Sequence, residues 1–357
     1  MSLVPLISRA DATGQQAARN RRGLVRVTWL RLLGLAMATA VLAAVVLASV
    51  LIGNYSISVS EVIAAVSGPT ESDLDRIIVH IRIPRTVAGL LAGVGLGTAG
   101  VVMQGITRNP LAGPGILGIN SGAGLAVVLA MTVFGVTAAS GYVWFAFVGA
   151  AIAAVFVYVL GSLGLGGATP VKLALAGAAF TAFAGAITSA ITLLDATTLE
   201  DFRFWVVGSL TRADHTSLAA AAPFIAIGVV AAILTSRTLN VMALGDDMAQ
   251  SLGARLWSAR VAAALAVVLL AGSATAIAGP IGFIGLVVPH IARLITGPDY
   301  RWIMAWTVVL APTLLLAADI LGRILLSPQT LQVGIITGIA GAPFFLYLVR
   351  NRKVSGL

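Results

Sequence analysis

The chain contains ten apolar segments, and most of them are long enough to cross a lipid bilayer, which takes about 20 residues. The segments lie at 29–52, 84–106, 112–134, 142–163, 170–194, 217–235, 258–278, 281–296, 302–318 and 331–349. The eighth is short and contains Pro289 and His290, so we expect a helix that is broken there. The pattern predicts an all-α membrane protein with about ten transmembrane helices.

The composition excludes a soluble fold. Hydrophobic residues make up 59% of the 357 residues and charged residues only 10%, whereas soluble domains carry about 25% charged residues. A soluble domain cannot hide so much apolar surface. The chain has no cysteine, which excludes disulfides and thiol chemistry. Its net charge of +9 is not gathered into a binding face, so we expect no nucleic-acid partner.

The distribution of charge predicts that both ends of the chain lie in the cytoplasm. With the N-terminus inside, the inner segments hold 16 basic and 4 acidic residues, and the outer segments hold 6 basic and 9 acidic residues. The inner side therefore carries +12 and the outer side −3. Because cytoplasmic loops of membrane proteins are rich in Lys and Arg, this asymmetry favours that orientation.

This topology divides the chain into a basic cytoplasmic tail at 1–28, one membrane domain of ten helices at 29–350, and a second cytoplasmic tail at 351–357. The main cytoplasmic loop is expected at 236–257, and the longer outer loops at 53–83 and 195–216. Arg21 and Arg22 before the first apolar segment resemble a secretion signal. That segment has 24 residues, however, and a signal core has 7–15, so we expect a retained span.

Small residues recur at intervals of about four in two segments, as Gly89, Gly93 and Gly97 and as Gly334, Gly338 and Gly341. Such ladders let helix backbones pack closely in a membrane, and the lining of a substrate path is the alternative. Similar runs at 85–88 and 260–263 begin the second and seventh segments. They indicate a possible inverted repeat of spans two to five and seven to ten.

The sequence lacks the usual motifs of enzymes and of ion-coupled transporters. It has no Walker A phosphate loop, and its three histidines are far apart in sequence. No segment carries a central acidic residue of the kind that proton relays use. An integral-membrane enzyme and a secondary transporter are therefore the weaker alternatives. If the chain takes part in active transport, we expect a partner to supply the energy.

Several motifs carry a resemblance to a known family. They are RIPR at 82–85, MQG at 103–105, NPLAGPG at 109–115, GINSGA at 118–123, LGDD at 244–247, SLG at 251–253, GFIGLVVPH at 282–290, AD at 318–319 with GR at 322–323, and GAPFF at 341–345. Together they resemble the FecCD-type permeases, which are type II ABC importer subunits for ferric siderophores, haem and cobalamin. The likeness covers residues 29 to about 350. The NPLAGPG run and Asn120 are more similar to siderophore permeases, so the resemblance implies that cargo, with haem or cobalamin as the alternative.

The resemblance implies that residues 245–253 form a coupling helix that docks into a cleft of an ATPase subunit. A solvated surface loop held by its own caps is the alternative. Leu244, Met248 and Leu252 have the spacing of a single apolar stripe, and acidic residues at a helix start favour the helix dipole. The residues assigned to coupling are Leu244, Gly245, Asp246, Asp247, Met248, Ser251, Leu252 and Gly253.

On the outer side, the resemblance implies that Arg82, Arg85 and Arg323 dock an acidic substrate-binding protein. The alternative for Arg82 and Arg85 is that they end a span with their charge in the interface. The alternative for Arg323 is a pair with Asp319, four residues earlier on the same helix. The acidic residues Glu71, Asp73 and Asp75 lie nearby in sequence and could mask the arginines.

The resemblance also places a cytoplasmic gate at Ala168, Thr169 and Pro170, for which a plain glycine-rich turn is the alternative. Only Thr169 keeps the hydroxyl chemistry found at the tip in cobalamin permeases. The translocation path is assigned to Met103, Gln104, Asn109 and Asn120. Because polar groups at membrane depth need partners, the three amide side chains could instead tie an irregular backbone together.

The partners follow from the same resemblance. It implies a protein of the bacterial cytoplasmic membrane that assembles with a second permease, two ATP-binding subunits and an extracytoplasmic substrate-binding protein. The second permease is either an identical copy or a paralogue. The chain itself is expected to bind no metal or cofactor and to catalyse no reaction, because the partner ATPase would bind ATP and Mg²⁺.

Overall fold

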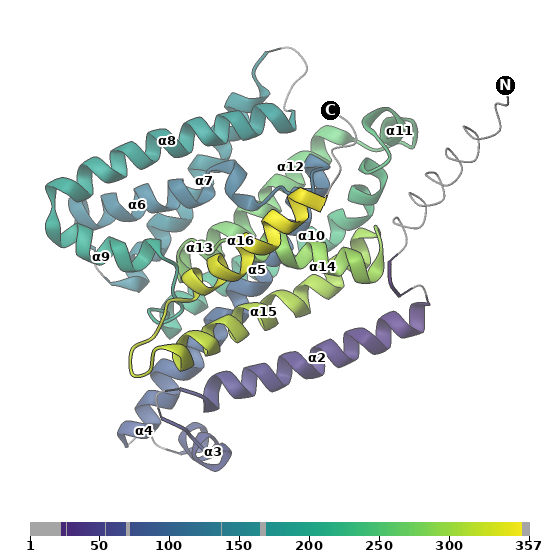
Figure 1. Cartoon of the computed structure of the whole chain (residues 1–357). Helices are drawn as coiled ribbons and strands as arrows, with labels where there is room; N and C mark the ends of the chain where they lie inside the picture. The colour runs from purple at the N-terminus through teal and green to yellow at the C-terminus, as the bar shows by residue number, and fades with distance from the viewer. Residues whose placement is uncertain are drawn as a thin grey trace, which may run out of the picture.

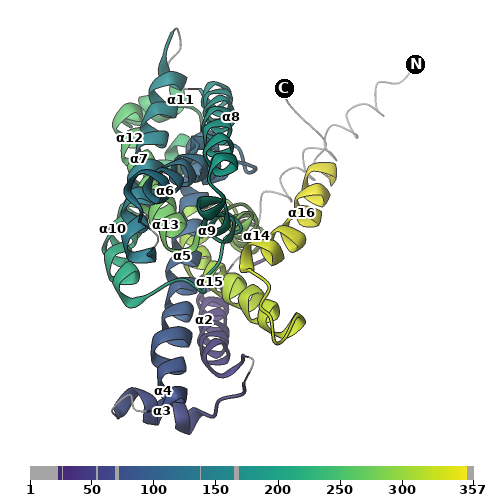
Figure 2. The same cartoon turned by 90° about the vertical axis from the view of Figure 1, so that its left-hand side faces the viewer.

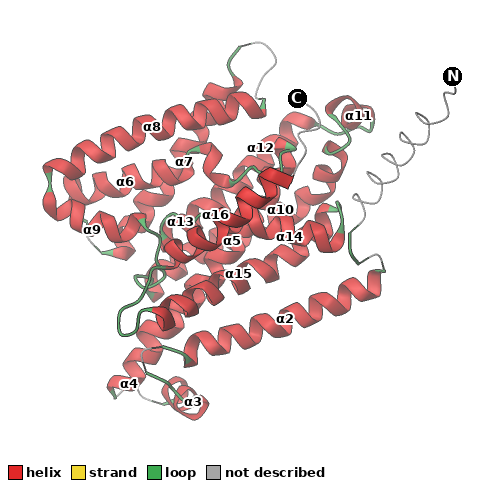
Figure 3. Cartoon of the chain, viewed as in Figure 1, coloured by secondary structure: helices red, strands yellow, loops and turns green. Residues whose placement is uncertain are grey.

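The computed structural model describes residues 23–25, 27–53, 55–68, 72–136, 138–164 and 169–351. Within these residues the regular structure is entirely helical, and no strand occurs (Figure 3). The predicted all-α class is therefore confirmed. Almost all of the two predicted tails, 1–28 and 351–357, lies outside the described residues.

In the part of the chain that the structure describes, seven helices are long and apolar enough to cross a membrane. They are α2 (Thr28–Leu51), α5 (Ile83–Thr107), α7 (Ala139–Ser162), α8 (Pro170–Leu194), α10 (His215–Met242), α12 with α13 (Leu256–Val267 and Ser273–Ala278, joined by the π-helix Val268–Gly272), and α15 (Tyr300–Leu325). Three further apolar helices are shorter: α6 (Ile119–Phe134), α14 (Ile284–Thr296) and α16 (Val333–Asn351). Each predicted segment thus corresponds to one of these helices, with α12 and α13 together forming the segment at 258–278, although only seven in the described residues meet the length and composition of a span.

The helix α5 lies at the centre of the molecule (Figure 1). It contacts α10, α12, α13, α14 and α15, and it is the most buried of the seven long apolar helices. A second group, α6, α7 and α8 with the short helix α9 (Ala196–Val206), packs together on one side. The helix α2 packs along α15, and α16 contacts α14 and α15 at the edge seen in Figure 2.

Glycines on α5 allow this central packing. A Cβ atom at Gly97 would lie 2.4 Å from Cβ of Ala311 on α15, and one at Gly100 would lie 1.8 Å from the carbonyl oxygen of Gly285 on α14. Both positions therefore need a residue without a side chain, because the Cβ atom of Ala311 and the backbone of Gly285 lie too close for one. This confirms the packing interpretation for the first glycine ladder. In the second ladder Gly338 faces open space, so close packing does not explain that position.

The outer segment predicted as a loop at 53–83 is largely helical. It contains α3 (Val59–Ser67), α4 (Asp73–Arg76) and the π-helix Ile77–Arg82, which continues directly into α5. Ser58 and Glu61 form a capping box at the start of α3. Ile57, Ala65 and Ile78 form a small separate core that fixes these elements at one end of the molecule. Glu71 lies outside the described residues.

The predicted break at Pro289 and His290 is wrong. Pro289 lies inside α14, which is continuous from Ile284 to Thr296. The irregular backbone precedes this helix and ends at Phe283, which has a φ of 68°. Pro289 has no N–H to donate to the carbonyl of Gly285 four residues earlier. A side chain of α5 supplies that hydrogen bond, as described below, so the helix continues through the proline.

Candidate functional site

The short helix α11 (Asp246–Ser251) occupies the loop predicted to contact an ATPase, at the end of the molecule where α2 begins (Figure 1). The helix α10 extends to Met242 and α12 begins at Leu256, so this loop is shorter than the predicted 236–257. Gly245 and Gly253 flank α11 with φ values of 112° and 83°, which side chains rarely adopt. These two glycines therefore set the sharp entry to the helix and the sharp exit from it.

The exposed side of the segment that contains α11 carries three large apolar residues. The side chains of Leu244, Met248 and Leu252 are 64%, 54% and 61% exposed. The opposite face is anchored, because Ala249 is buried against Met242 and Leu256 in a small core of its own. Three large apolar side chains exposed within one short segment, outside the long apolar helices, form a surface suited to a protein partner.

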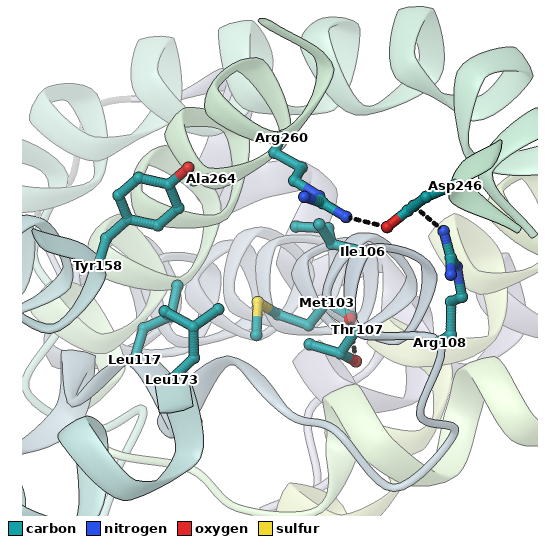
Figure 4. Close-up of a pocket in the computed structure, with 10 residues that line it drawn as sticks. All are labelled: Met103, Ile106, Thr107, Arg108, Leu117, Tyr158, Leu173, Asp246, Arg260 and Ala264. Atoms are coloured by element: carbon teal, nitrogen blue, oxygen red, sulfur yellow. Dashed lines mark hydrogen bonds and ion pairs between the residues drawn. The ribbon is translucent and has the colours of Figure 1, made fainter. Parts of the chain in front are cut away.

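Asp246 ties α11 to two long helices. One carboxylate oxygen accepts a hydrogen bond from Nη2 of Arg260 on α12 at 2.9 Å, and the other accepts from Nη2 of Arg108 at the end of α5. Arg108 has a φ of 51°, in the left-handed region that residues with side chains seldom occupy. The carboxylate thus links α11 to the central helix and to α12 (Figure 4).

A pocket lies beneath this ion-pair network (Figure 4). Arg108, Asp246 and Arg260 form its polar side, and Met103, Leu117, Tyr158 and Leu173 are among the apolar residues that line it. Met103 had been assigned to the translocation path, and the structure places it in this pocket. Any movement of Asp246 would alter the pocket directly, because the same three charged side chains form both features.

Asp247 and Ser251, which were also assigned to coupling, do not belong to this ion-pair network. Asp247 is exposed, and its backbone carbonyl accepts a hydrogen bond from the hydroxyl of Ser251 at 2.6 Å. That bond closes the last turn of α11 internally. Asp247 therefore differs from its neighbour Asp246, whose carboxylate bonds to two arginines.

At the opposite end, a buried carboxylate joins α5 to α15. Asp319 is fully buried and accepts hydrogen bonds from Nε and Nη2 of Arg85, at distances of 2.8–3.1 Å. It also accepts from Nε of Arg323 at 3.0 Å, so the intrahelical pair considered for Arg323 is present. Two guanidinium groups surround one carboxylate, which leaves this buried cluster with a net positive charge.

Arginines also cap the end of α2. Arg82 donates from Nη1 to the carbonyls of Val50 and Leu51, at 2.7 and 2.8 Å. Arg323 donates from Nη1 to the carbonyls of Ser49 and Ile52, at 2.6 and 3.0 Å. The last carbonyls of a helix have no partner within it, and positive charge is favourable beside them. These bonds hold α2 against α5 and α15.

The structure brings together Arg82, Arg85 and Arg323, which were predicted to dock a binding protein, but it buries all three. They line one pocket, with Gly53, Tyr55, Ile77, Ile81 and Thr330 as its other residues. Most of the guanidinium nitrogens of these arginines already donate hydrogen bonds to the end of α2 or to Asp319. The acidic neighbour Asp73 forms an ion pair with Arg76. A docking role for the three arginines stays a prediction.

Gln104 bonds to backbone at the point where Pro289 interrupts the hydrogen bonding of α14. Its amide nitrogen lies 3.3 Å from the carbonyl oxygen of Leu286 and 3.5 Å from that of Gly285. The second carbonyl is the one that Pro289 leaves without a helical donor. This geometry favours the structural interpretation of Gln104 over a place on the path.

Asn120 and Asn109 also bond within the protein. The Oδ1 atom of Asn120 on α6 accepts a hydrogen bond from the hydroxyl of Thr275 on α13 at 3.1 Å. The Oδ1 atom of Asn109 accepts from the backbone N–H of Leu111 at 2.9 Å, which stabilises the turn after α5. A place on the translocation path stays a prediction for both residues.

The proposed gate is only partly described, because Ala168 lies outside the described residues. Thr169 precedes α8 and accepts a hydrogen bond from the backbone N–H of Lys172 at 3.3 Å. Pro170 occupies the first position of α8, where its missing N–H costs nothing. Both residues therefore begin a helix, and their role as a gate stays a prediction.

Two features of the site were not anticipated. Arg108 and Arg260 were counted only as inner basic residues, yet they hold Asp246 from 138 and 14 positions away in the sequence. Asp319 was considered only as a partner of Arg323, yet it also binds Arg85 on α5. The only sequence signal was that each of these charges stands beside an apolar segment. Among the described residues, no three His, Asp or Glu side chains lie close enough to hold a metal ion.

Within the described residues, an all-helical bundle with seven apolar helices of membrane-spanning length defines a polytopic membrane protein. Residues 41–351 match the FecCD transport family, and the chain belongs to that family. It therefore works with ATPase and substrate-binding partners and with a permease partner, in the bacterial cytoplasmic membrane.

Named relatives agree with this assignment. The chain is 45% identical over 309 residues to the ferric enterobactin transport system permease protein FepD of Escherichia coli, covering 86% of this chain and 92% of the relative. It is 36% identical over 289 residues to the hemin transport system permease protein HmuU of Yersinia pestis, covering 80% and 86%. A solved metal-chelate type ABC transporter in an inward-facing conformation superposes with a TM-score of 0.78 at 27% identity, covering 89% of this chain and 99% of that one.

Proposed function

We propose that this chain is the membrane-spanning subunit of an ABC importer that carries a ferric siderophore into the cytoplasm. The observation that carries the proposal is the exposed apolar stripe of α11, held in place by the bonds of Asp246 to α5 and α12. The similarity to the ferric enterobactin permease supports the class of cargo. The iron would cross within its chelate, as cargo, and the chain would break no covalent bond.

In the proposed topology, ten spans cross the membrane and both termini lie in the cytoplasm. The charge distribution supports this orientation, because it places +12 on the side that carries α11. Residues 29–350 form one permease domain between the two tails. The likeness of 85–88 to 260–263 supports an inverted repeat of spans two to five and seven to ten.

The proposed cycle begins when a binding protein delivers the chelate to the outer side of two permease subunits. The second subunit is an identical copy or a paralogue. ATP and Mg²⁺ bind to two partner ATPases, whose clefts receive α11 through Leu244, Met248 and Leu252. When the ATPases close, α11 moves with them. The carboxylate of Asp246 then pulls on the end of α5 and on α12, which opens the inner side to the cargo.

Uptake in a strain that lacks the gene tests this function. The strain would receive either the wild-type chain or a version without residues 245–253, and it would be given a radio-iron-labelled siderophore, labelled haem or labelled cobalamin. We expect the wild type to restore uptake of at least one ferric siderophore, and the shortened version to restore none. Restored uptake of haem or cobalamin in place of a siderophore would change the cargo. Full uptake by the shortened version would remove the ATP-driven mechanism.

A further inference from the structure

A groove runs along the outside of the molecule between α10 and α15. Val229 and Ile233 of α10 and Met304 and Val308 of α15 are among the apolar residues that line it. Arg237 lies eight residues beyond Val229 on α10, which corresponds to about 12 Å along the helix. The hydrocarbon of one bilayer leaflet is about 15 Å thick, so an apolar groove of this length matches a large part of one leaflet.

Two arginines stand where this groove reaches the end of the molecule that carries α11. Arg301 uses Nε and Nη2 to bind Asp299, at 3.3 and 3.1 Å, which leaves Nη1 for another partner. Arg237 is exposed, and no ion pair or hydrogen bond joins its side chain to another described residue. Arg255 lines the adjoining recess with Arg237. Three arginines and the single acid Asp299 therefore give this end of the groove a net charge of about +2.

We propose that this groove binds an anionic phospholipid. Its acyl chain would lie between α10 and α15, and its phosphate group would contact Arg237 and Arg301. A soluble anion would gain nothing from the apolar walls, and a zwitterionic lipid would bring its own positive charge to the arginines. Basic recesses between membrane helices on the cytoplasmic side are known to hold anionic head groups. The placement in the inner leaflet rests on the proposed topology.

Native mass spectrometry of the purified full-length chain tests this site with two lipids of equal acyl chains, phosphatidylglycerol and phosphatidylcholine. We expect the wild type to retain phosphatidylglycerol in preference to phosphatidylcholine. Each arginine near a head group contributes roughly a fivefold change in binding, so Arg237→Gln with Arg301→Gln should remove most of the preference. Arg203→Gln is the matched control, since Arg203 is an exposed arginine on α9, outside the groove, and should leave the preference unchanged.

A second variant distinguishes binding of the whole lipid from binding of its head group alone. Ala305→Phe places a ring in the groove without changing any charge, because Ala305 lines it beside Met304. We expect this variant to lose phosphatidylglycerol as well, and we expect millimolar inorganic phosphate not to displace the lipid from the wild type. Equal retention of the two lipids by the wild type would overturn the proposal. Displacement of the lipid by phosphate would also overturn it. Unchanged retention of phosphatidylglycerol by both groove variants, when they are folded, would overturn it as well.

Discussion

Asp246 on α11 accepts a hydrogen bond at 2.9 Å from Arg260 on α12, fourteen residues later in the chain. The same carboxylate also binds Arg108 at the end of α5. The carboxylate of Asp246 thus joins the short helix α11 to the central helix α5 and to α12, in addition to the packing of Ala249. Force applied to α11 by a partner would reach two membrane helices through these ion pairs.

Replacing that carboxylate should uncouple transport with little loss of stability. Asp246 is 39% exposed, and partly exposed ion pairs contribute only about 0–1 kcal/mol. We therefore expect Asp246→Asn to change the melting temperature little and to lower the initial rate of cargo uptake severalfold. Asp247→Asn is the matched control, because it removes an exposed neighbouring charge that forms neither ion pair. Equal uptake by the two variants would contradict a transmitting role for Asp246.

The buried cluster of Asp319 with Arg85 and Arg323 should instead contribute strongly to the stability of the fold. Asp319→Asn leaves Arg85 and Arg323 without their shared counter-ion, and the loss of one partner from a buried pair costs about 3–5 kcal/mol. We expect a marked fall in the melting temperature of the detergent-purified chain. Asp73→Asn removes a side chain that is 97% exposed and should change the melting temperature hardly at all. Similar melting temperatures for the two variants would show that the cluster does not stabilise the fold.

Gln104→Leu distinguishes a structural role from a place on the path. The substitution removes the hydrogen bonds to the carbonyls of Leu286 and Gly285, which should cost about 1 kcal/mol. We expect a lower melting temperature, an unchanged KM for cargo, and uptake that falls only with the amount of folded protein. Gln332→Leu, at a partly exposed position before α16, is the control. A raised KM with an unchanged melting temperature would place Gln104 on the path instead.

The connection between α10 and α15 should depend on pH. Burial by itself would raise the pKa of Asp299, but hydrogen bonds from Arg301 and Asn240 outweigh it and hold the pKa below the ordinary value of 3.8. A lowered pKa favours the charged form in the folded state. The resulting stabilisation is present above pH 3.8 and is lost as the pH falls through the lower folded pKa.

Asp299→Asn tests this dependence while it preserves the capping of α15, because Asn also caps helices well. We expect the variant to melt below the wild type at pH 7, and we expect the difference to shrink as the pH is lowered through the range below 3.8. Melting curves recorded from pH 7 downward would measure it. A difference that stays constant over the whole range would mean that the charge of Asp299 contributes nothing.

The positions of the long helices could be predicted because apolar runs and capping residues lie close together in the chain. The segment predicted at 170–194 coincides with α8, where Thr169 and Pro170 mark the start. The segment predicted at 29–52 differs from α2 by one residue at each end. In both cases the information is local. A run of apolar residues long enough to span the bilayer needs no distant partner to be recognised.

The break expected at Pro289 could not have been corrected from local sequence, because the compensating group, Gln104, belongs to another helix. The ion pairs were missed for the same reason. Asp319 finds Arg85 across 234 positions, and Asp246 finds Arg108 across 138. A single sequence shows that these residues are charged, but the packing of α5 decides which of them meet. The resemblance to a family predicts coupling at residues 245–253, and the structure adds how α11 is attached to α5 and α12.

The most direct test of the account is whether the apolar stripe of α11 holds the partner ATPase. The measurement is the amount of ATPase that copurifies with tagged permease carrying Met248→Asp or Leu252→Asp, compared with Val66→Asp. Val66 is likewise exposed and apolar, at 62%, but it lies on α3 at the opposite end. We expect both α11 variants to lose the ATPase, and the control and the wild type to retain it. Retention of the ATPase by both α11 variants at the wild-type level would contradict it.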